Sequence, residues 1–102
     1  MRHFATVVIG GGAAGIMAAG VAASRRGNVL LCERMEKPQR KVRITGKGRC
    51  NLTNLCSEEE FLAKVRCGAD FFASALHRFN SEATMRFFEH IGVPLTVERG
   101  RR

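Results

Sequence analysis

The sequence predicts an α/β fold that begins with a parallel βαβ unit. Three observations lead to this prediction. The short β-branched run Ala5–Ile9 ends in a glycine cluster, and the cluster leads into the alanine-rich stretch Ala13–Ser24. A second short apolar run, Val29–Cys32, follows directly. Strand, glycine turn, helix and strand within about thirty residues form a βαβ unit of the Rossmann-like type.

Each element of this unit has its own local signal. Ala5–Ile9 is apolar on both faces, which is typical of a buried strand in a parallel sheet. The small residues of Ala13–Ser24 favour a helix. After them, Arg25 and Arg26 supply cations for the carboxyl end of the helix, and Gly27 is expected to be its left-handed cap. Val29–Cys32 is expected to be the second buried strand.

The pattern changes after the second strand. Arg34–Asn54 has no sustained period and is rich in glycine and basic residues, so a long loop is expected there. Ser57-Glu58-Glu59-Glu60 fits a capping box, which predicts a helix that reaches about Cys67.

Two more helices and a strand are expected in the last third of the chain. One helix covers about Phe71–Phe79, and the next starts after Ser81 as its cap and ends before Gly92. Leu95–Glu98 alternates and predicts the start of a strand. A dinucleotide-binding sheet needs several βαβ units, so residues 1–102 are expected to be the amino-terminal part of a longer enzyme.

Composition narrows the class of protein. An apolar share of 45% with 25% charged residues is ordinary for a globular chain and excludes a disordered tail. The uncharged stretch from Phe4 to Ser24 is too rich in glycine and alanine for a signal peptide or a membrane span. The four cysteines have neither CxxC spacing nor zinc-like spacing with histidine. A cytoplasmic protein with reduced thiols, no metal and no membrane partner is expected; its oligomeric state is open.

The net charge of +8 is concentrated between Arg34 and Arg49, where Glu36 is the only acidic residue. An anionic ligand or partner would fit this segment, and so would a solvated basic loop. Within it, Thr45–Asn51 is a donor-rich loop whose glycines allow close backbone approach and whose Lys47 and Arg49 add charge. Such a loop could bind a cofactor phosphate, a polar ring edge or RNA phosphates.

Gly10, Gly12 and Gly15 form a G-x-G-x-x-G motif between a predicted strand and a predicted helix. Gly10 would allow the tight turn out of the strand, and Gly12 would let the backbone approach a pyrophosphate. Gly15 would let the helix pack closely on the strand. The phosphates would then meet free amides at the helix start.

Glu33 lies eighteen residues beyond Gly15, where an acidic residue accepts hydrogen bonds from an adenosine ribose. A 2′-phosphate would be repelled by this carboxylate, which argues against NADP at this site and leaves FAD or NAD. The structural alternative is a glycine-rich turn that binds no ligand.

A family resemblance rests on several runs of residues. They are Val8–Gly15, Glu33, Arg40-Lys41, Thr45–Asn54, Gly92–Leu95 and Glu98–Arg101. Together they make the chain similar to the BaiN/RdsA-like family of FAD-dependent oxidoreductases, which have a glutathione-reductase-like FAD domain. The run Thr-Gly-Lys-Gly-Arg-Cys-Asn-Leu-Thr-Asn is the specific part of the match, whereas the glycine motif is shared by many flavoproteins.

The resemblance implies a flavoprotein of two domains, of which this chain is an incomplete fragment. It implies that FAD lies on the glycine motif and Glu33, with Lys41 and the Thr45–Asn51 loop along the cofactor towards the flavin. Gln39 stands where the family has a glycine before Arg-Lys. The expected cofactor-binding residues are Gly10, Gly12, Ala13, Ala14, Gly15, Glu33, Arg34, Lys41, Thr45, Gly46, Gly48, Arg49, Cys50 and Asn51.

The same resemblance implies a flavin-dependent reductase of activated carbon–carbon double bonds, with NAD(P)H as the electron donor. Steroid-like substrates and ribosomal RNA uridine are both open, so the alternatives are a flavoprotein that acts on or binds RNA through its basic loop and an NAD-binding module without flavin. The sequence assigns no catalytic residue. Cys50 has no second cysteine at two-residue spacing, so packing or backbone positioning is the expectation for its thiol.

Overall fold

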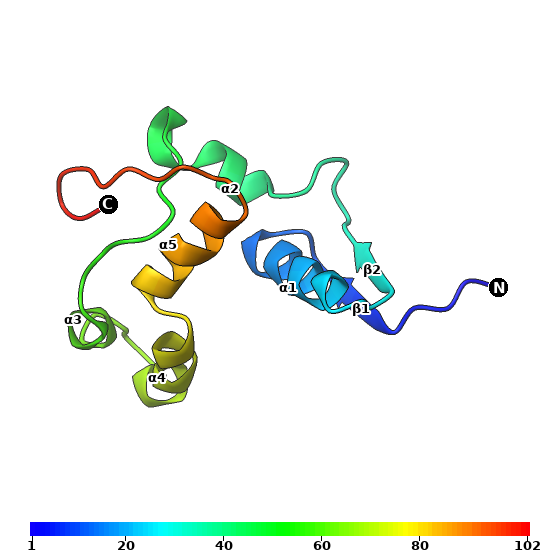
Figure 1. The fold of residues 1–102 in the computed structure, drawn as a ribbon, viewed down its shortest axis with the longest axis horizontal. Coiled ribbons are helices and arrows are strands. Elements are labelled where there is room, and N and C mark those ends of the chain that lie inside the picture. Colours follow the sequence, from blue (N-terminus) through cyan, green and yellow to red (C-terminus); the bar gives the residue numbers. More distant parts are fainter. The chain divides into compact units, whose positions relative to one another are not determined.

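A computed structural model describes all residues from 1 to 102, in two compact units of residues 1–50 and 51–102. The first unit contains β1 (Thr6–Ile9), α1 (Ala13–Ser24), β2 (Val29–Cys32), α2 (Arg40–Ile44) and the one-turn 3₁₀ segment η1 (Gly46–Gly48). The second contains α3 (Glu58–Leu62), α4 (Ala69–Arg78) and α5 (Ser81–His90), as Figure 1 shows. Each unit is described by itself.

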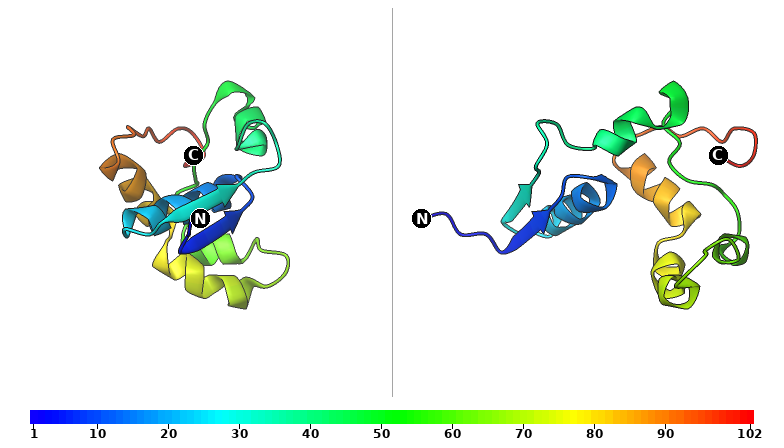
Figure 2. Two further views of the ribbon diagram at one scale, coloured as in Figure 1. Left: turned by 90° about the vertical axis from the view of Figure 1, so that its right-hand side faces the viewer. Right: turned by 180° about the vertical axis from the view of Figure 1, so that it is seen from behind.

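The predicted βαβ unit is confirmed. β1 and β2 pair in parallel, with Thr6 opposite Val29 and Ile9 opposite Cys32. Figure 2 shows the two strands side by side and pointing the same way, with α1 along one face. The N–H of Gly10 donates to the Cys32 carbonyl at 2.8 Å and extends the ladder into the glycine turn. α1 has the bounds that the sequence predicts.

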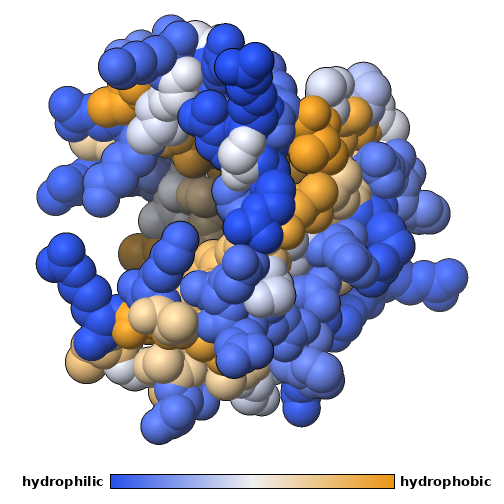
Figure 3. Space-filling view, turned by 90° about the vertical axis from the view of Figure 1, so that its left-hand side faces the viewer, coloured by the Kyte–Doolittle hydropathy of each residue, from blue (hydrophilic) through white to orange (hydrophobic).

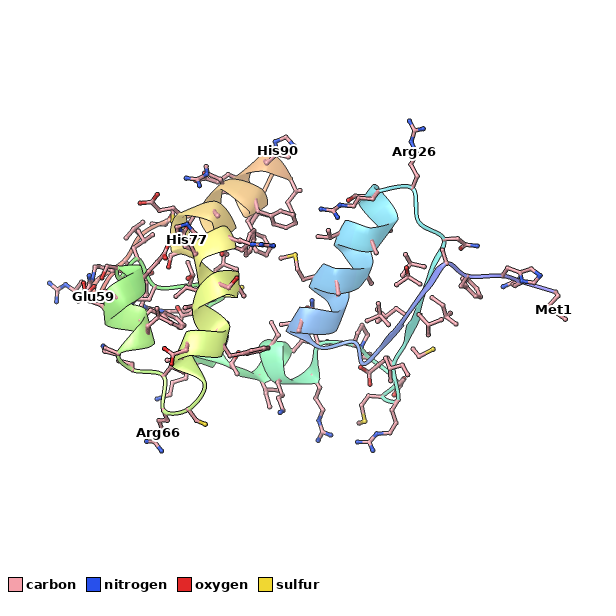
Figure 4. The ribbon with its side chains drawn as sticks, turned by 90° about the horizontal axis from the view of Figure 1, so that it is seen from below. Met1, Arg26, Glu59, Arg66, His77 and His90 are labelled. Atoms are coloured by element: carbon pink, nitrogen blue, oxygen red, sulfur yellow. The ribbon has the colours of Figure 1, made fainter.

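The left-handed cap of α1 is Arg26, at φ 62°, and the prediction of Gly27 was wrong by one residue. The N–H of Arg26 donates to the Ala23 carbonyl and that of Gly27 to the Ala22 carbonyl, which is a Schellman motif. A Cβ on Gly27 would lie 2.7 Å from the Ala22 oxygen, so the glycine is needed for space rather than for its φ. Figure 4 shows the Arg26 side chain extending away from this end of α1.

The strands are not buried as the sequence predicts. Val7 is 54% exposed and Ile9 86% exposed, and β2 is half-buried up to the exposed Cys32. Their β-branched, apolar composition suits a sheet covered on both faces, but in this unit the two-stranded sheet has α1 on one face. Gly11 in the glycine turn is the buried residue of this unit.

The segment predicted as a long loop contains two short elements. α2 starts after Gln39, which has a left-handed φ of 60°, and η1 has positive φ at Gly46, Lys47 and Gly48. The Arg49 N–H donates to the Gly46 carbonyl at 2.9 Å, which closes η1 as a tight turn. The absence of an apolar period concealed α2, because a helix of five residues is too short to show one.

In the second unit the capping box is confirmed. Ser57 Oγ accepts from the Glu60 N–H at 3.1 Å, and Glu60 Oε2 accepts from the Ser57 N–H at 2.9 Å. The helix ends at Leu62 and not near Cys67, because i→i+3 bonds from Lys64 and Val65 tighten its last turn.

The other two helices are confirmed with small differences in their bounds. α4 begins at Ala69, two residues before the prediction, after a left-handed Gly68. The cap of α5 is Asn80 and not Ser81: its Oδ1 accepts from the Ala83 N–H at 3.0 Å, and Ser81 is the first helical residue. Asparagine and serine are equally good caps, so the sequence alone does not separate the two positions.

The apolar contacts of the second unit are mainly aromatic. Leu76 of α4 is buried, and three phenylalanine pairs have ring centroids 5.3–6.0 Å apart: Phe61–Phe72, Phe79–Phe87 and Phe87–Phe88. Apolar residues of both units are exposed, and Figure 3 shows apolar residues at the surface of the chain among hydrophilic ones. No helix is long and apolar enough to cross a membrane.

The strand predicted at Leu95–Glu98 is not formed. Instead, the Glu98 N–H donates to the Arg102 carbonyl at 2.7 Å and closes a turn. This turn is held by the Leu55 N–H on the Arg101 carbonyl and by an ion pair of 2.9 Å between Arg101 and Glu60. Alternation predicts which side chains share a face, but a strand also needs a neighbouring strand to complete its hydrogen bonds.

Candidate functional site: the glycine turn and the end of β2

The glycine turn between β1 and α1 requires glycine at two positions for reasons inside the chain. Gly10 has φ +100°, a conformation that residues with a Cβ rarely adopt. A Cβ on Gly15 would lie only 1.8 Å from the Gly10 carbonyl oxygen. The predicted roles of Gly10 in the turn and of Gly15 in close packing therefore agree with the geometry.

Gly12 differs from both of these glycines. Its φ of −78° is open to any residue, and a Cβ built there would meet no atom within 4 Å. The fold therefore does not require glycine at this exposed position. A missing Cβ that the protein itself does not need leaves room for the close approach of a ligand.

The amino end of α1 also lacks an internal partner. Gly12 is its N-cap and supplies no side-chain cap, and the first turn, with Ala13, Ala14 and Gly15, holds no acidic residue. The first amides of a helix have no partner within the helix and carry its positive dipole end. In this twelve-residue helix they are available to an anion beside the open space at Gly12.

Glu33 stands directly after β2 and binds the glycine turn. Its Oε2 accepts from the Gly11 N–H at 2.7 Å, and its Oε1 accepts from the Met35 N–H at 2.7 Å. These two backbone bonds, Met35 first and Gly11 second, lower the pKa of Glu33 and hold it ionised. Each carboxylate oxygen has a further lone pair, so the group can still accept from ribose hydroxyls.

Gly11 is the residue of this site that the sequence analysis missed. It is buried, its N–H donates to Glu33, and its carbonyl accepts from the Gln39 N–H at 2.7 Å. A Cβ on Gly11 would lie 2.9 Å from Glu33 Oε2 and 3.1 Å from Pro38 Cβ. The signal available was the middle glycine of the unbroken run Gly10–Gly12, a position that the G-x-G-x-x-G pattern treats as variable.

Gln39 was noted only as a departure from the family pattern. Its φ of 60° and ψ of 32° are the left-handed conformation that glycine adopts most easily. The backbone therefore follows a course suited to the family's glycine although the side chain is glutamine. Through the bond from Gln39 to Gly11, the segment after β2 folds back onto the glycine turn.

The remaining predicted cofactor residues of the first unit lie after Glu33. Arg34 follows it directly and is exposed, and Lys41 is an exposed residue of α2. Thr45 Oγ1 donates to the Val42 carbonyl at 3.0 Å, so its hydroxyl proton is already used in a hydrogen bond at the end of α2. Gly46 and Gly48 flank Lys47 in η1. Lys47 has a φ of 47°, in the left-handed region that residues with a side chain seldom adopt, so it is a strained residue of the turn.

Three predicted residues end this segment. Arg49 and Cys50 follow η1, and Cys50 is exposed with a free thiol. Asn51 is the first residue of the second unit, so the structure does not place it beside the glycine turn. Hydrogen bonds thus bring together the glycine turn, the end of β2 and the start of α2, but not the whole predicted set.

Histidine and acidic groups of the second unit form a separate network. Glu58 accepts from Asn80 Nδ2 at 2.9 Å and lies 3.3 Å from His77 Nδ1; the Asn80 bond, then the His77 contact, lower the pKa of Glu58. Figure 4 shows His77 on α4 and His90 at the end of α5. This network joins the start of α3 to the region between α4 and α5.

The parallel βαβ unit, its glycine turn and the acidic residue after β2 define a Rossmann-type dinucleotide-binding unit. A comparison with family models matches the HI0933-like protein Rossmann domain over residues 4–102. The chain belongs to this family.

Two curated relatives are similar over most of this chain. The "ribosomal RNA dihydrouridine synthase" of Escherichia coli (strain K12) is 40% identical over 79 residues, which are 78% of this chain and 19% of that protein. The "3-dehydro-bile acid delta(4,6)-reductase" of Clostridium scindens is 40% identical over 97 residues, 91% of this chain and 22% of that protein. The chain thus spans about a fifth of the length of these relatives.

Proposed function

We propose that this chain supplies the dinucleotide-binding site of an FAD-dependent oxidoreductase. The observation that carries the proposal is Gly12, whose missing side chain is required by neither its φ nor its packing and which opens onto the uncapped start of α1. A pyrophosphate there would accept from the amides of Ala13 and Ala14, and the lack of a Cβ would permit its close approach.

Glu33 would hold the ribose of the same cofactor. Its carboxylate is ionised and fixed by the Gly11 and Met35 amides, with lone pairs left for two hydroxyl donors. A 2′-phosphate would meet like charge at this position, which favours FAD over NADP as the resident group. When bound, FAD would supply the hydride chemistry, and this chain would bind and orient it.

The names of the two relatives support a common reaction class. One name describes a reductase of a bile acid with double bonds, and the other a synthase of dihydrouridine. A dihydrouridine differs from uridine by saturation of one ring double bond. We therefore propose the reduction of a carbon–carbon double bond with electrons from NAD(P)H, in the cytoplasm, as the activity of the protein.

RNA is the second candidate substrate, beside a small steroid-like molecule. It is favoured by the similarity to a relative named for ribosomal RNA and by the exposed cations of α2, Arg40, Lys41 and Arg43. Binding through phosphates would weaken steeply as salt rises, whereas binding of an uncharged ring system would not.

The test is flavin retention in the purified protein. We expect the wild type to show flavin absorbance and FAD affinity, and Glu33→Ala to bind FAD about tenfold more weakly or worse, because the ribose loses its acceptor. The control is Glu59→Ala, which removes an exposed glutamate of α3. Equal FAD affinity of wild type and Glu33→Ala would contradict the assignment of Glu33 to the ribose. A wild type that does not bind FAD would contradict the proposed function.

A further inference from the structure

A hollow of about 280 Å³ lies in the first unit outside the glycine turn. Its walls come from α2 and the segment before it: Met35, Glu36, Lys37, Arg40, Arg43 and Ile44. Arg40, Arg43 and Ile44 are spaced i, i+3 and i+4 and so share one face of α2. Lys41, which is assigned to the cofactor, does not line the hollow.

The hollow has unbalanced charge. Lys37, Arg40 and Arg43 contribute three cations against the single carboxylate of Glu36. Within residues 1–102 the side chains of these three residues make no hydrogen bond and no ion pair. A structural role in an ion-pair network is therefore absent, and three like charges around one hollow favour an anion of two or more charges.

The hollow also has an apolar part. Met35 is 40% exposed and Ile44 is 76% exposed beside the two arginines. A simple inorganic anion would leave these side chains in water, whereas a ligand with a phosphate and a planar ring could cover them. The guanidinium group suits phosphate because its fork of donors matches two phosphate oxygens.

We propose that this hollow binds the phosphate ester of a second nucleotide, with Arg40 and Arg43 on the phosphate and Met35 and Ile44 against the base. Its volume of about 280 Å³ is just below the lower end of the usual range for ligand pockets, about 300 Å³, so it offers room for a single nucleotide at most. The hollow adjoins the proposed cofactor site through Met35, whose N–H binds Glu33 Oε1 at 2.7 Å. None of its six residues is assigned to FAD, but the two ligands it would suit, a nicotinamide dinucleotide and RNA, are the electron donor and the second candidate substrate named above, so this inference rests on the proposed function.

The nucleotide could be part of a reduced dinucleotide donor or of a polynucleotide. The test uses the purified protein, with NADPH, NADH and single-stranded oligouridylate as the probes, and compares the double variant Arg40→Gln/Arg43→Gln with the wild type. Its matched control is Arg66→Gln/Arg78→Gln, which removes the same charge from the second unit; Figure 4 shows Arg66 pointing away from the turn between α3 and α4.

We expect the Arg40/Arg43 variant to lose at least about tenfold in affinity for one class of probe, and the control to lose much less. If affinity falls for NADPH and NADH alone, the ligand of the hollow is the dinucleotide donor. If affinity falls for oligouridylate alone, the ligand is a polynucleotide. Lys37 lies outside α2, and Lys37→Gln should lower the affinity for the same probe. This single variant replaces the double variant in the test if the double variant does not fold.

Two results would overturn the proposal. The first is that no probe binds the wild type, or that both double variants change every affinity equally. The second is that the Arg40/Arg43 variant loses FAD, which would make the hollow part of the cofactor site. FAD content measured in the same samples separates this failure from a failure of the proposed function, because the latter would leave the wild type itself without flavin.

Discussion

The substitution Gly15→Ala tests the close contact between α1 and the end of β1. The added Cβ would lie 1.8 Å from the Gly10 carbonyl oxygen, so this contact must lengthen by more than 1 Å even to reach 3.0 Å. The obstacle is backbone of the glycine turn, which is tied to β2 through the Gly10 N–H on the Cys32 carbonyl. The helix must therefore move away from the strand as a whole.

Gly15→Ala should lower the free energy of unfolding through overpacking, which destabilises by about 1–3 kcal/mol. The gain in helix propensity from glycine to alanine is about 0.5–1 kcal/mol and does not offset it. For a unit of this size each kcal/mol shifts Tm by about 4–8 °C, so Gly15→Ala should lower Tm by several degrees.

Gly20→Ala is the matched control in the same helix. A Cβ on Gly20 meets nothing within 4 Å, so this variant should gain the helix propensity and raise Tm slightly. Thermal unfolding followed by circular dichroism measures both variants. If Gly15→Ala and Gly20→Ala shift Tm in the same direction and by similar amounts, the inferred contact does not exist.

Three further predictions follow from single residues. Because its two backbone bonds lower the pKa of Glu33, the stability they supply is present above the ordinary value of 4.5 and is lost as pH falls through the folded-state value. The Tm gap between wild type and Glu33→Gln should therefore narrow below about pH 4.5, and a gap that widens on acidification would contradict this. Gln39→Gly should raise stability by up to about 1 kcal/mol in urea unfolding, because it relieves a left-handed φ; a loss would show that the glutamine side chain matters more. Ser57→Ala should cost about 1 kcal/mol through loss of the capping box, whereas Ser74→Ala, on an exposed part of α4, should change little; equal effects on Tm would refute the capping role.

The sequence was sufficient for the elements whose signals are local. β1, α1 and β2 follow from composition and from the glycine run, and the capping box at Ser57 follows from a four-residue pattern. The position of Glu33 after β2 also follows, because a fixed spacing from the glycine motif determines it. These features depend on residues that are neighbours in the chain.

The features that the sequence could not provide depend on distant partners. The bond between Glu33 and the Gly11 amide joins residues 22 positions apart, and the bond from Gln39 to Gly11 depends on the course of the segment between them. The strand expected at Leu95–Glu98 needs a neighbouring strand, and the exposure of β1 depends on what covers the sheet. Local pattern carries no information on any of these partners.

The most direct test of the central claim is the FAD affinity of Gly12→Ala. Its φ and the empty space around its Cβ predict no steric strain, so Tm should fall only slightly, because alanine is a weaker N-cap than glycine. A methyl group at the start of α1 would obstruct the pyrophosphate. We predict that the purified variant folds, unfolds at a temperature only slightly below that of the wild type, and binds FAD at least about tenfold more weakly. Wild-type FAD affinity in this folded variant would contradict the assignment of the glycine turn as the cofactor's pyrophosphate site.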